Sequence, residues 1–150
     1  MKPLELDVSY ASRRPWVPRP ALLRAWAAAV LPPRTAPAVL SVRVVGALRS
    51  RSLNAQYRHK HRPTNVLSFA GAGSAPDGRL FLGELVVCAP VVAREAAAQD
   101  KTLEAHWAHM IVHGVLHLLG FDHERRIEAA KMAAREIQIL DRLGFSNPYR

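Results

Sequence analysis

Apolar and acidic residues alternate at the start of the chain, over Leu4–Val8. Such alternation is typical of a β-strand with one buried face, because successive side chains point to opposite sides of a strand. Three further segments are rich in branched and aromatic residues and are also predicted as strands; they are 39–45, 64–69 and 80–88. Between the last two, residues 71–78 are rich in glycine and contain Asp77-Gly78, which predicts a hairpin loop and therefore antiparallel strands.

The other apolar residues recur mainly at helical spacing and predict five helices. We expect them at 21–31, 50–57, 90–99, from the N-cap Thr102 to Gly120, and at 124–143. In the last helix the expected inner face consists of Ile127, Ala130, Ala134, Ile137 and Leu140. This order of elements predicts an α+β fold, formed by a single domain over residues 1–150. Its small four-stranded mixed sheet should pack against about five helices.

The helix that follows Thr102 carries the clearest sign of chemistry. His113 and His117 are four residues apart, so both imidazoles lie on one helix face, one turn apart. His123 follows three residues after Gly120, whose position predicts the end of the helix, so the three rings can meet at one point. Three neutral imidazoles suit Zn²⁺ and leave a fourth position for water, as in a catalytic site. Apolar neighbours predict that this metal-binding helix is buried, and the alternative is a set of core histidines bonded to the backbone.

Gly114 distinguishes this helix from the H-E-x-x-H helix of zinc peptidases, which has the same histidine spacing. The peptidases have their general-base glutamate at that position, so the glycine argues against peptide hydrolysis. The general base stays open between a metal hydroxide and a neighbouring histidine such as His109. We expect His106 and His109 to form a partly exposed row; the alternative is that they support the metal ligands or contact the substrate. Asp122 either orients a ligand imidazole or caps the turn.

The charge of the chain indicates what it binds. Lysine and arginine outnumber aspartate and glutamate by 21 to 12, which gives a net charge of +9. A positive surface favours polyanionic partners, with nucleic acid ahead of an anionic membrane. The basic run Arg58-His59-Lys60-His61-Arg62 follows the second predicted helix. On its own it is either a solvated loop or a phosphate-binding edge.

No segment predicts secretion or membrane insertion. The first residues lack the apolar core of a secretory signal, and residues 21–31 are too few to span a bilayer. The single cysteine, Cys88, lies in an apolar run, which favours a buried core position over a reactive thiol. We therefore expect a cytoplasmic protein that does not engage a membrane.

Several blocks of the sequence match the pattern of a known family. His113–His123 fits H-G-x-L-H-L-x-G-[YF]-D-H, Leu53–Phe69 fits L-N-x-x-Y-R-x-K-x-x-P-T-[DN]-V-L-S-F, Leu82–Cys88 fits L-G-[DE]-[IL]-V-[IV]-C, and Met132, Glu136, Leu140 and Gly144 have the family's spacing. With these blocks the chain resembles the YbeY family, bacterial metal-dependent endoribonucleases of ribosomal RNA maturation. It departs from common family residues at His61, Glu84 and Phe121, and none of these is an expected metal ligand.

The resemblance implies a set of site residues. They are His113, His117 and His123 as ligands of one zinc ion per chain, Arg58 as a catalytic residue, and Lys60 and Arg62 as contacts to RNA phosphate. To these the helix spacing and the turn add His109 and Asp122 as candidate supports of the ligands. A guanidinium at Arg58 would stabilise phosphate charge through paired hydrogen bonds, which lysine cannot reproduce.

The implied function is that of a single-strand-type endoribonuclease in ribosomal RNA processing. Its implied tasks are maturation of the 3′ end of 16S ribosomal RNA and ribosome quality control, with the small ribosomal subunit and assembly factors as partners. Two alternatives stay open. One is a ribosome-associated RNA-binding factor with a structural zinc, and the other is a metal hydrolase acting on another class of substrate.

Overall fold

The structure, a computed structural model, describes residues 4–32, 37–122 and 124–150. Within these residues the chain forms four strands and five helices. They are β1 (Leu4–Tyr10), α1 (Pro20–Val30), β2 (Ala38–Val45), α2 (Ala47–Arg58), β3 (Val66–Ser74), β4 (Leu80–Cys88), α3 (Ala89–Ala98), α4 (Leu103–Leu118) and α5 (Arg126–Arg142). The α+β fold expected from the sequence pattern is confirmed, with the predicted order of elements.

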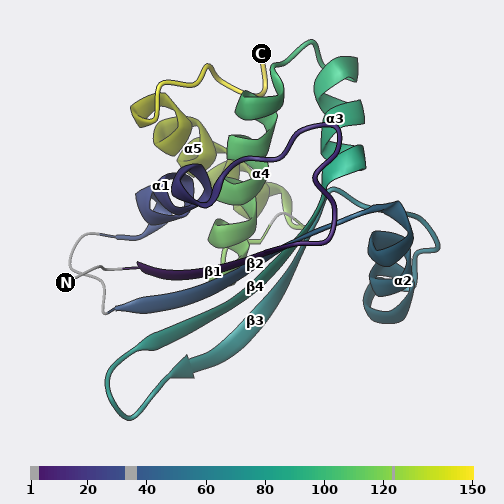
Figure 1. The fold of residues 1–150 in the computed structure, drawn as a ribbon. Helices are drawn as coiled ribbons and strands as arrows, with labels where there is room; N and C mark the ends of the chain where they lie inside the picture. Colours follow the sequence, from purple (N-terminus) through teal and green to yellow (C-terminus); the bar gives the residue numbers. More distant parts are fainter. Residues whose placement is uncertain (1–3, 33–36, 123) are drawn as a thin grey trace.

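The sheet has the strand order β1-β2-β4-β3 (Figure 1). β1, β2 and β4 run parallel, and β3 runs antiparallel to β4, as the hairpin signal predicted. The parallel step from β1 to β2 needs a crossover connection, which contains α1. The sheet is therefore mixed, with β1 and β3 at its edges.

β3 is longer than the sequence pattern predicted. It continues to Ser74 and pairs with the start of β4, so the expectation of a loop from residue 71 was wrong for residues 71–74. The register shifts between Ala70 and Gly73. At Gly71 a Cβ atom would collide with the carbonyl oxygen of Phe81, so only glycine lets the two backbones approach this closely. The glycines that suggested a loop instead accommodate an irregular strand pair.

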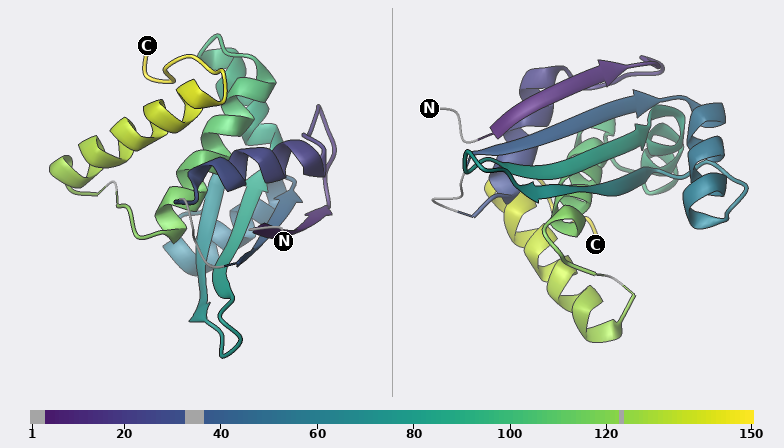
Figure 2. Two further views of the ribbon diagram at one scale, coloured as in Figure 1. Left: turned by 90° about the vertical axis from the view of Figure 1, so that its left-hand side faces the viewer. Right: turned by 90° about the horizontal axis from the view of Figure 1, so that it is seen from below.

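Four helices, α1, α3, α4 and α5, lie over one face of the sheet (Figures 1 and 2). α4 contacts the other three helices as well as β3 and β4, and most of its residues are buried, as expected. α2 lies apart from these helices, at one end of the sheet (Figure 1). There Leu53 packs in a second apolar cluster with Val86 and Cys88, so the cysteine is the core residue that its sequence context indicated.

The inner face of α5 differs from the predicted one. Its buried residues are Met132, Glu136, Ile139 and Leu140. Of the expected set only Leu140 is buried, and Ile127 is 70% exposed. The helix therefore turns a different face to the core from the one expected, and this face includes the carboxylate of Glu136.

Across the part of the chain that the structure describes, no helix combines the length and the apolar character that a membrane crossing requires.

Candidate metal centre and its cleft

Four histidines of α4 form a row along one side of the helix. The hydroxyl oxygen of Thr102 accepts a hydrogen bond from the Ala105 N–H (3.1 Å) and so caps the start of α4, as predicted. Ring centroids of successive histidines are 6.0 Å apart for His106 and His109, 6.3 Å for His109 and His113, and 4.8 Å for His113 and His117. The helical spacing therefore aligns the rings one behind another.

Gly114 lets α4 lie close to the sheet. A Cβ atom at this position would be 2.8 Å from Cδ2 of Leu85 on β4, a fully buried side chain. On β3 the hydroxyl of Ser68 donates a hydrogen bond to the Gly114 carbonyl oxygen (3.2 Å). The place that holds a general base in zinc peptidases is thus packed against the sheet.

His113 and His117 line a polar cleft of about 510 Å³. Arg58, Lys60 and Arg62 line the same cleft from α2 and the loop that follows it, and Asp122 lines it from the turn after α4. Six of the residues singled out in the sequence therefore meet at one cavity, although up to 64 positions separate them along the chain.

The loop with the basic run is held to α2 by two buried polar side chains. Asn54 donates from Nδ2 to the Arg62 carbonyl oxygen (2.8 Å). The Ser50 hydroxyl accepts from the Thr64 N–H (2.9 Å) and donates to the Thr64 carbonyl oxygen (3.0 Å). Both Ser50 and Asn54 are 2% exposed. The loop backbone is thereby fixed while its cationic side chains remain exposed.

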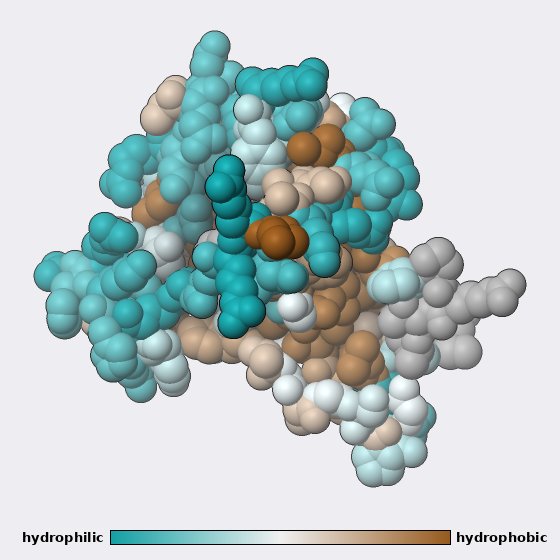
Figure 3. Space-filling model, turned by 180° about the vertical axis from the view of Figure 1, so that it is seen from behind, coloured by the Kyte–Doolittle hydropathy of each residue, from teal (hydrophilic) through white to brown (hydrophobic). Residues whose placement is uncertain are grey.

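α2 and this loop lie on the right of Figure 1 and on the left of Figure 3, where the surface is strongly hydrophilic. Arg58 ends the helix, and His59 caps it in the left-handed conformation, with a φ of 58°. This cap turns the chain sharply after Arg58. The cations of the loop then follow one another along the edge of the cleft.

Glu136 lies behind the histidine row as a buried carboxylate, 1% exposed. Its Oε2 is 2.5 Å from Nε2 of His109 and 3.5 Å from Nδ1 of His113, and its Oε1 accepts from the Tyr149 hydroxyl at 2.8 Å. Burial alone would raise the pKa of Glu136, but the contacts with His109, His113 and Tyr149 outweigh it and lower that pKa to about 2. Glu136 is therefore ionised at neutral pH and can only accept hydrogen bonds.

The charge of Glu136 determines which atoms around it carry protons. Burial lowers the pKa of His109 in spite of the carboxylate, so this ring is neutral at pH 7 and donates its Nε2 hydrogen to Glu136. Burial and the Glu136 charge raise the pKa of Tyr149, whose hydroxyl stays protonated.

A second buried contact joins His106 to the edge of the cleft. Nε2 of His106 lies 2.9 Å from Oε1 of Glu95, which also accepts from Nδ2 of Asn65, a residue that lines the cleft. Burial tends to raise the pKa of Glu95, but the hydrogen bonds from His106 and Asn65 lower it overall. His106 and His109 are 2% and 8% exposed, so the expected partly exposed row was wrong for these two.

His109 and Asp122 differ in how they relate to the cleft. His109 is not among the described residues that line it. Asp122 does line it, and its Oδ1 accepts from the Glu124 N–H (2.9 Å), the bond that caps the turn. The third expected ligand, His123, lies outside the residues that the structure describes.

One group of side chains has the composition of a metal site within the described residues. Donor atoms of His109, His113 and Glu136 all lie within 4.8 Å of one another, so this group could bind a metal ion. It shares only His113 with the ligand set expected from the sequence. No role for Glu136 or Tyr149 was predicted from the sequence. The signal that could have identified Glu136 is its position on α5, because the residues one turn before and after it, Met132 and Leu140, are core residues.

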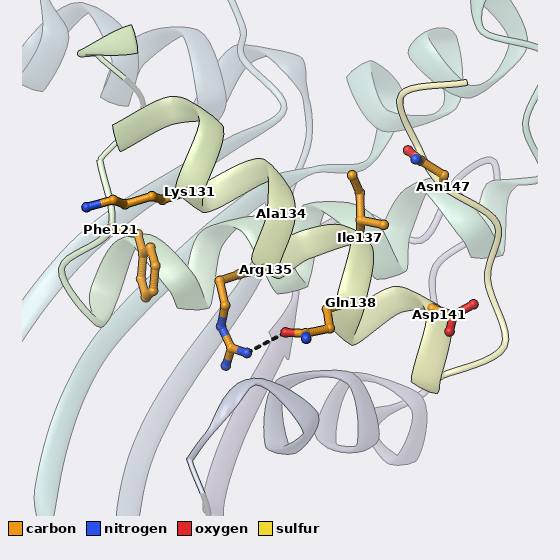
Figure 4. Close-up of a pocket in the computed structure, with 8 residues that line it drawn as sticks. All are labelled: Phe121, Lys131, Ala134, Arg135, Ile137, Gln138, Asp141 and Asn147. Carbon is orange, nitrogen blue, oxygen red and sulfur yellow. Dashed lines mark hydrogen bonds between the residues drawn. The ribbon is translucent and has the colours of Figure 1, made fainter. Parts of the chain in front are cut away.

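A larger hollow of about 630 Å³ lies along α5, and neither His109, His113 nor Glu136 lines it. Figure 4 shows that Phe121, Ala134 and Ile137 contribute its apolar part, and that Arg135 is hydrogen-bonded to Gln138 (2.8 Å). None of the histidines that the structure describes lines it. The smaller cleft at α4 is therefore the candidate site.

Comparisons with known proteins identify relatives of this chain. The sequence model of one family, described as Endoribonuclease YbeY, matches residues 21–144. The curated protein Endoribonuclease YbeY of Pseudomonas syringae pv. tomato is 48% identical over 149 residues, which cover 97% of this chain and 88% of that protein. A solution structure of a Thermotoga maritima protein has a TM-score of 0.57 at 22% identity, covering 93% of this chain and 92% of the other, and shows the same fold.

Proposed function

The chain belongs to the YbeY family, and from this membership and the geometry of the cleft we propose that it is a metal-dependent endoribonuclease. Its relative in Pseudomonas syringae pv. tomato is named an endoribonuclease, an enzyme that cleaves RNA within the strand. The observation that carries the proposal is the meeting of His113, His117 and Arg58 at one cleft. Residues 1–150 would act as one YbeY-like domain.

We propose that His113, His117 and His123 hold one zinc ion per chain. Two imidazoles bound to one tetrahedral Zn²⁺ through nitrogens at about 2.0 Å have ring centroids roughly 5 Å apart. The 4.8 Å between the centroids of His113 and His117 fits this arrangement. Bound there, zinc would act as a Lewis acid on phosphate and lower the pKa of bound water.

Arg58 would bind the phosphate at which the strand is cut. Negative charge grows on the phosphate oxygens during cleavage, and a guanidinium stabilises it through two parallel hydrogen bonds. Arg58 is exposed at the end of α2 and lines the same cleft as His113 and His117. Lys60 and Arg62, exposed on the anchored loop, would hold neighbouring phosphates and set the path of the strand.

His109 and Asp122 would serve the ligands in different ways. Nε2 of His109 is bonded to Glu136 and the residue does not line the cleft, so it would support His113 through that carboxylate and would not be the general base that takes a proton from the nucleophile. Asp122 lines the cleft and accepts from the Glu124 N–H, so it would help to fix the segment that carries the third ligand.

The substrate we propose is ribosomal RNA in a single-stranded region. The task is maturation of the 3′ end of 16S ribosomal RNA and quality control of ribosomes in the cytoplasm, together with the small subunit and assembly factors. The net charge of +9 supports a polyanionic partner. The alternatives are an RNA-binding factor with a structural zinc and a metal hydrolase of another substrate class.

Cleavage of precursor ribosomal RNA, alone and with small subunits, tests the proposal. The assay compares the parent with His113→Ala and Arg58→Lys, and zinc content is measured for each. Arg51→Lys is the matched control, because Arg51 is exposed on α2 and lies outside the residues that line the cleft.

We expect His113→Ala to lose both zinc and cleavage, Arg58→Lys to lose cleavage alone, and Arg51→Lys to keep both. Equal cleavage by the parent and Arg58→Lys would remove Arg58 from the mechanism. Tight RNA binding without any cleavage would favour the RNA-binding factor.

A further inference from the structure

Glu136 is a charged group in a place where charge is costly. It projects from α5 toward α4 and is 1% exposed, between buried core residues Met132 and Ile139 of its own helix. An ionised carboxylate in such a place destabilises the fold unless hydrogen-bond donors surround it. Three donors do so, and two of them, His109 and His113, belong to the histidine row.

We propose that Glu136 and Tyr149 are positioning residues that fix the orientation of the His113 ring and thereby which of its two nitrogens binds the metal. This inference rests on the proposed function, since it concerns the same metal centre. A neutral imidazole carries its single proton on one of its two nitrogens, and the partner of one nitrogen decides which. Nδ1 of His113 faces the Glu136 carboxylate, so the proton belongs on Nδ1 and Nε2 becomes the nitrogen that binds a metal.

The distance between Glu136 and His109 argues against a metal ion shared by these two residues. Two ligand atoms on one tetrahedral metal ion, each about 2.1 Å from it, are roughly 3.4 Å apart. Oε2 of Glu136 and Nε2 of His109 are only 2.5 Å apart, a distance that fits a hydrogen bond to an ionised oxygen. The carboxylate therefore binds two imidazole rings from behind and does not share a metal ion with His109.

Tyr149 completes the arrangement from the segment after α5. Its hydroxyl donates to Oε1 of Glu136, which leaves Oε2 to the two histidines. Its ring packs edge-on against His109, with centroids 5.5 Å apart and an interplanar angle of 85°. Within this segment the Tyr149 N–H donates to Oδ1 of Asn147 (2.9 Å). Tyr149 thus fixes the carboxylate, and the carboxylate fixes His113.

The test is the zinc affinity of purified full-length variants, measured by competition with a chromophoric chelator. Glu136→Gln keeps the shape and removes the charge, and Tyr149→Phe removes only the hydroxyl. Glu128→Gln, on the same helix but with its side chain 45% exposed, is the control for the first. Tyr10→Phe, whose hydroxyl is bonded to the Pro18 carbonyl, is the control for the second.

We expect the zinc dissociation constant to rise about 10–100-fold in Glu136→Gln. Tyr149→Phe should give a smaller rise and both controls none. Because positioning residues act through His113, excess zinc should restore cleavage in both variants. Loss of zinc as complete as in His113→Ala would make Glu136 a ligand and overturn the inference.

Unchanged affinity in both Glu136→Gln and Tyr149→Phe, with zinc lost in His113→Ala, would also overturn it while leaving the proposed function intact. A parent protein that binds no zinc would instead contradict the proposed function, and the inference with it. Should Glu136→Gln fail to fold, as judged by circular dichroism, Tyr149→Phe decides alone.

Discussion

Replacement of Ser50 by alanine should loosen the basic loop without altering any residue that lines the cleft. Ser50 is buried on α2, and its hydroxyl makes two hydrogen bonds to the backbone of Thr64. These bonds join the end of the loop that carries Lys60 and Arg62 to the helix. Alanine removes both bonds and leaves a backbone N–H and a carbonyl without their protein partner.

The magnitude follows from the two bonds and one opposing effect. Each hydrogen bond contributes about 1 kcal/mol net to the free energy of unfolding, so the loss of two costs about 2 kcal/mol. Alanine exceeds serine in helix propensity by roughly 0.5 kcal/mol. The net loss is therefore about 1.5 kcal/mol, which lowers the melting temperature by roughly 3–6 °C in a domain of this size.

Urea denaturation of Ser50→Ala and Ser52→Ala separates the two effects. Ser52 is exposed on the same helix, so its replacement keeps the propensity gain and breaks neither bond to Thr64. The difference between the variants should be about 2 kcal/mol. RNA affinity should fall in Ser50→Ala only. A difference below about 0.5 kcal/mol would refute the anchoring role of Ser50.

Three further outcomes follow from the structure. Gly114→Ala should lower the free energy of unfolding by about 1 kcal/mol, because displacing the buried Leu85 outweighs the gain in helix propensity; a more stable variant in urea denaturation would contradict this. Lys60→Ala and Arg62→Ala should each reduce the slope of log affinity for single-stranded RNA against log salt by about 0.7, and an unchanged slope would exclude a phosphate contact. Because the pKa of Glu95 is lowered in the fold, its ionised form stabilises the protein above about pH 4.5, and this contribution is lost as pH falls through the lower folded value. The stability difference between the parent and Glu95→Gln should therefore shrink from pH 6 to pH 3, and a constant difference would count against the hydrogen bonds from His106 and Asn65.

Features encoded by near neighbours could be predicted from the sequence. The spacing of His113 and His117 placed both rings on one helix face, and Thr102 marked where that helix begins. The alternation in β1 and the Asp77-Gly78 turn predicted strands and their direction. In each case the residues that decide the conformation lie within a few positions of one another.

Features that depend on distant partners could not be predicted in this way. Glu136 is 27 positions from His109, and its contacts exist only because α5 packs on α4. The same carboxylate reverses the expected face of α5, since periodicity assigns a glutamate to the solvent side. Gly71 and Gly73 suggested a loop, yet the facing strand β4 leaves no room for a side chain at Gly71, and Gly73 has a positive φ of 81°. A single sequence shows the residue types but not the tertiary contacts that override them.

Removal and return of the metal test the central claim most directly. The parent protein and His113→Ala are stripped with a chelator, assayed for cleavage of ribosomal RNA, reloaded with one equivalent of zinc and assayed again. We predict that the stripped parent loses cleavage and regains it with zinc, whereas His113→Ala stays inactive. Cleavage that persists in the stripped parent would contradict a metal-dependent site at His113 and His117.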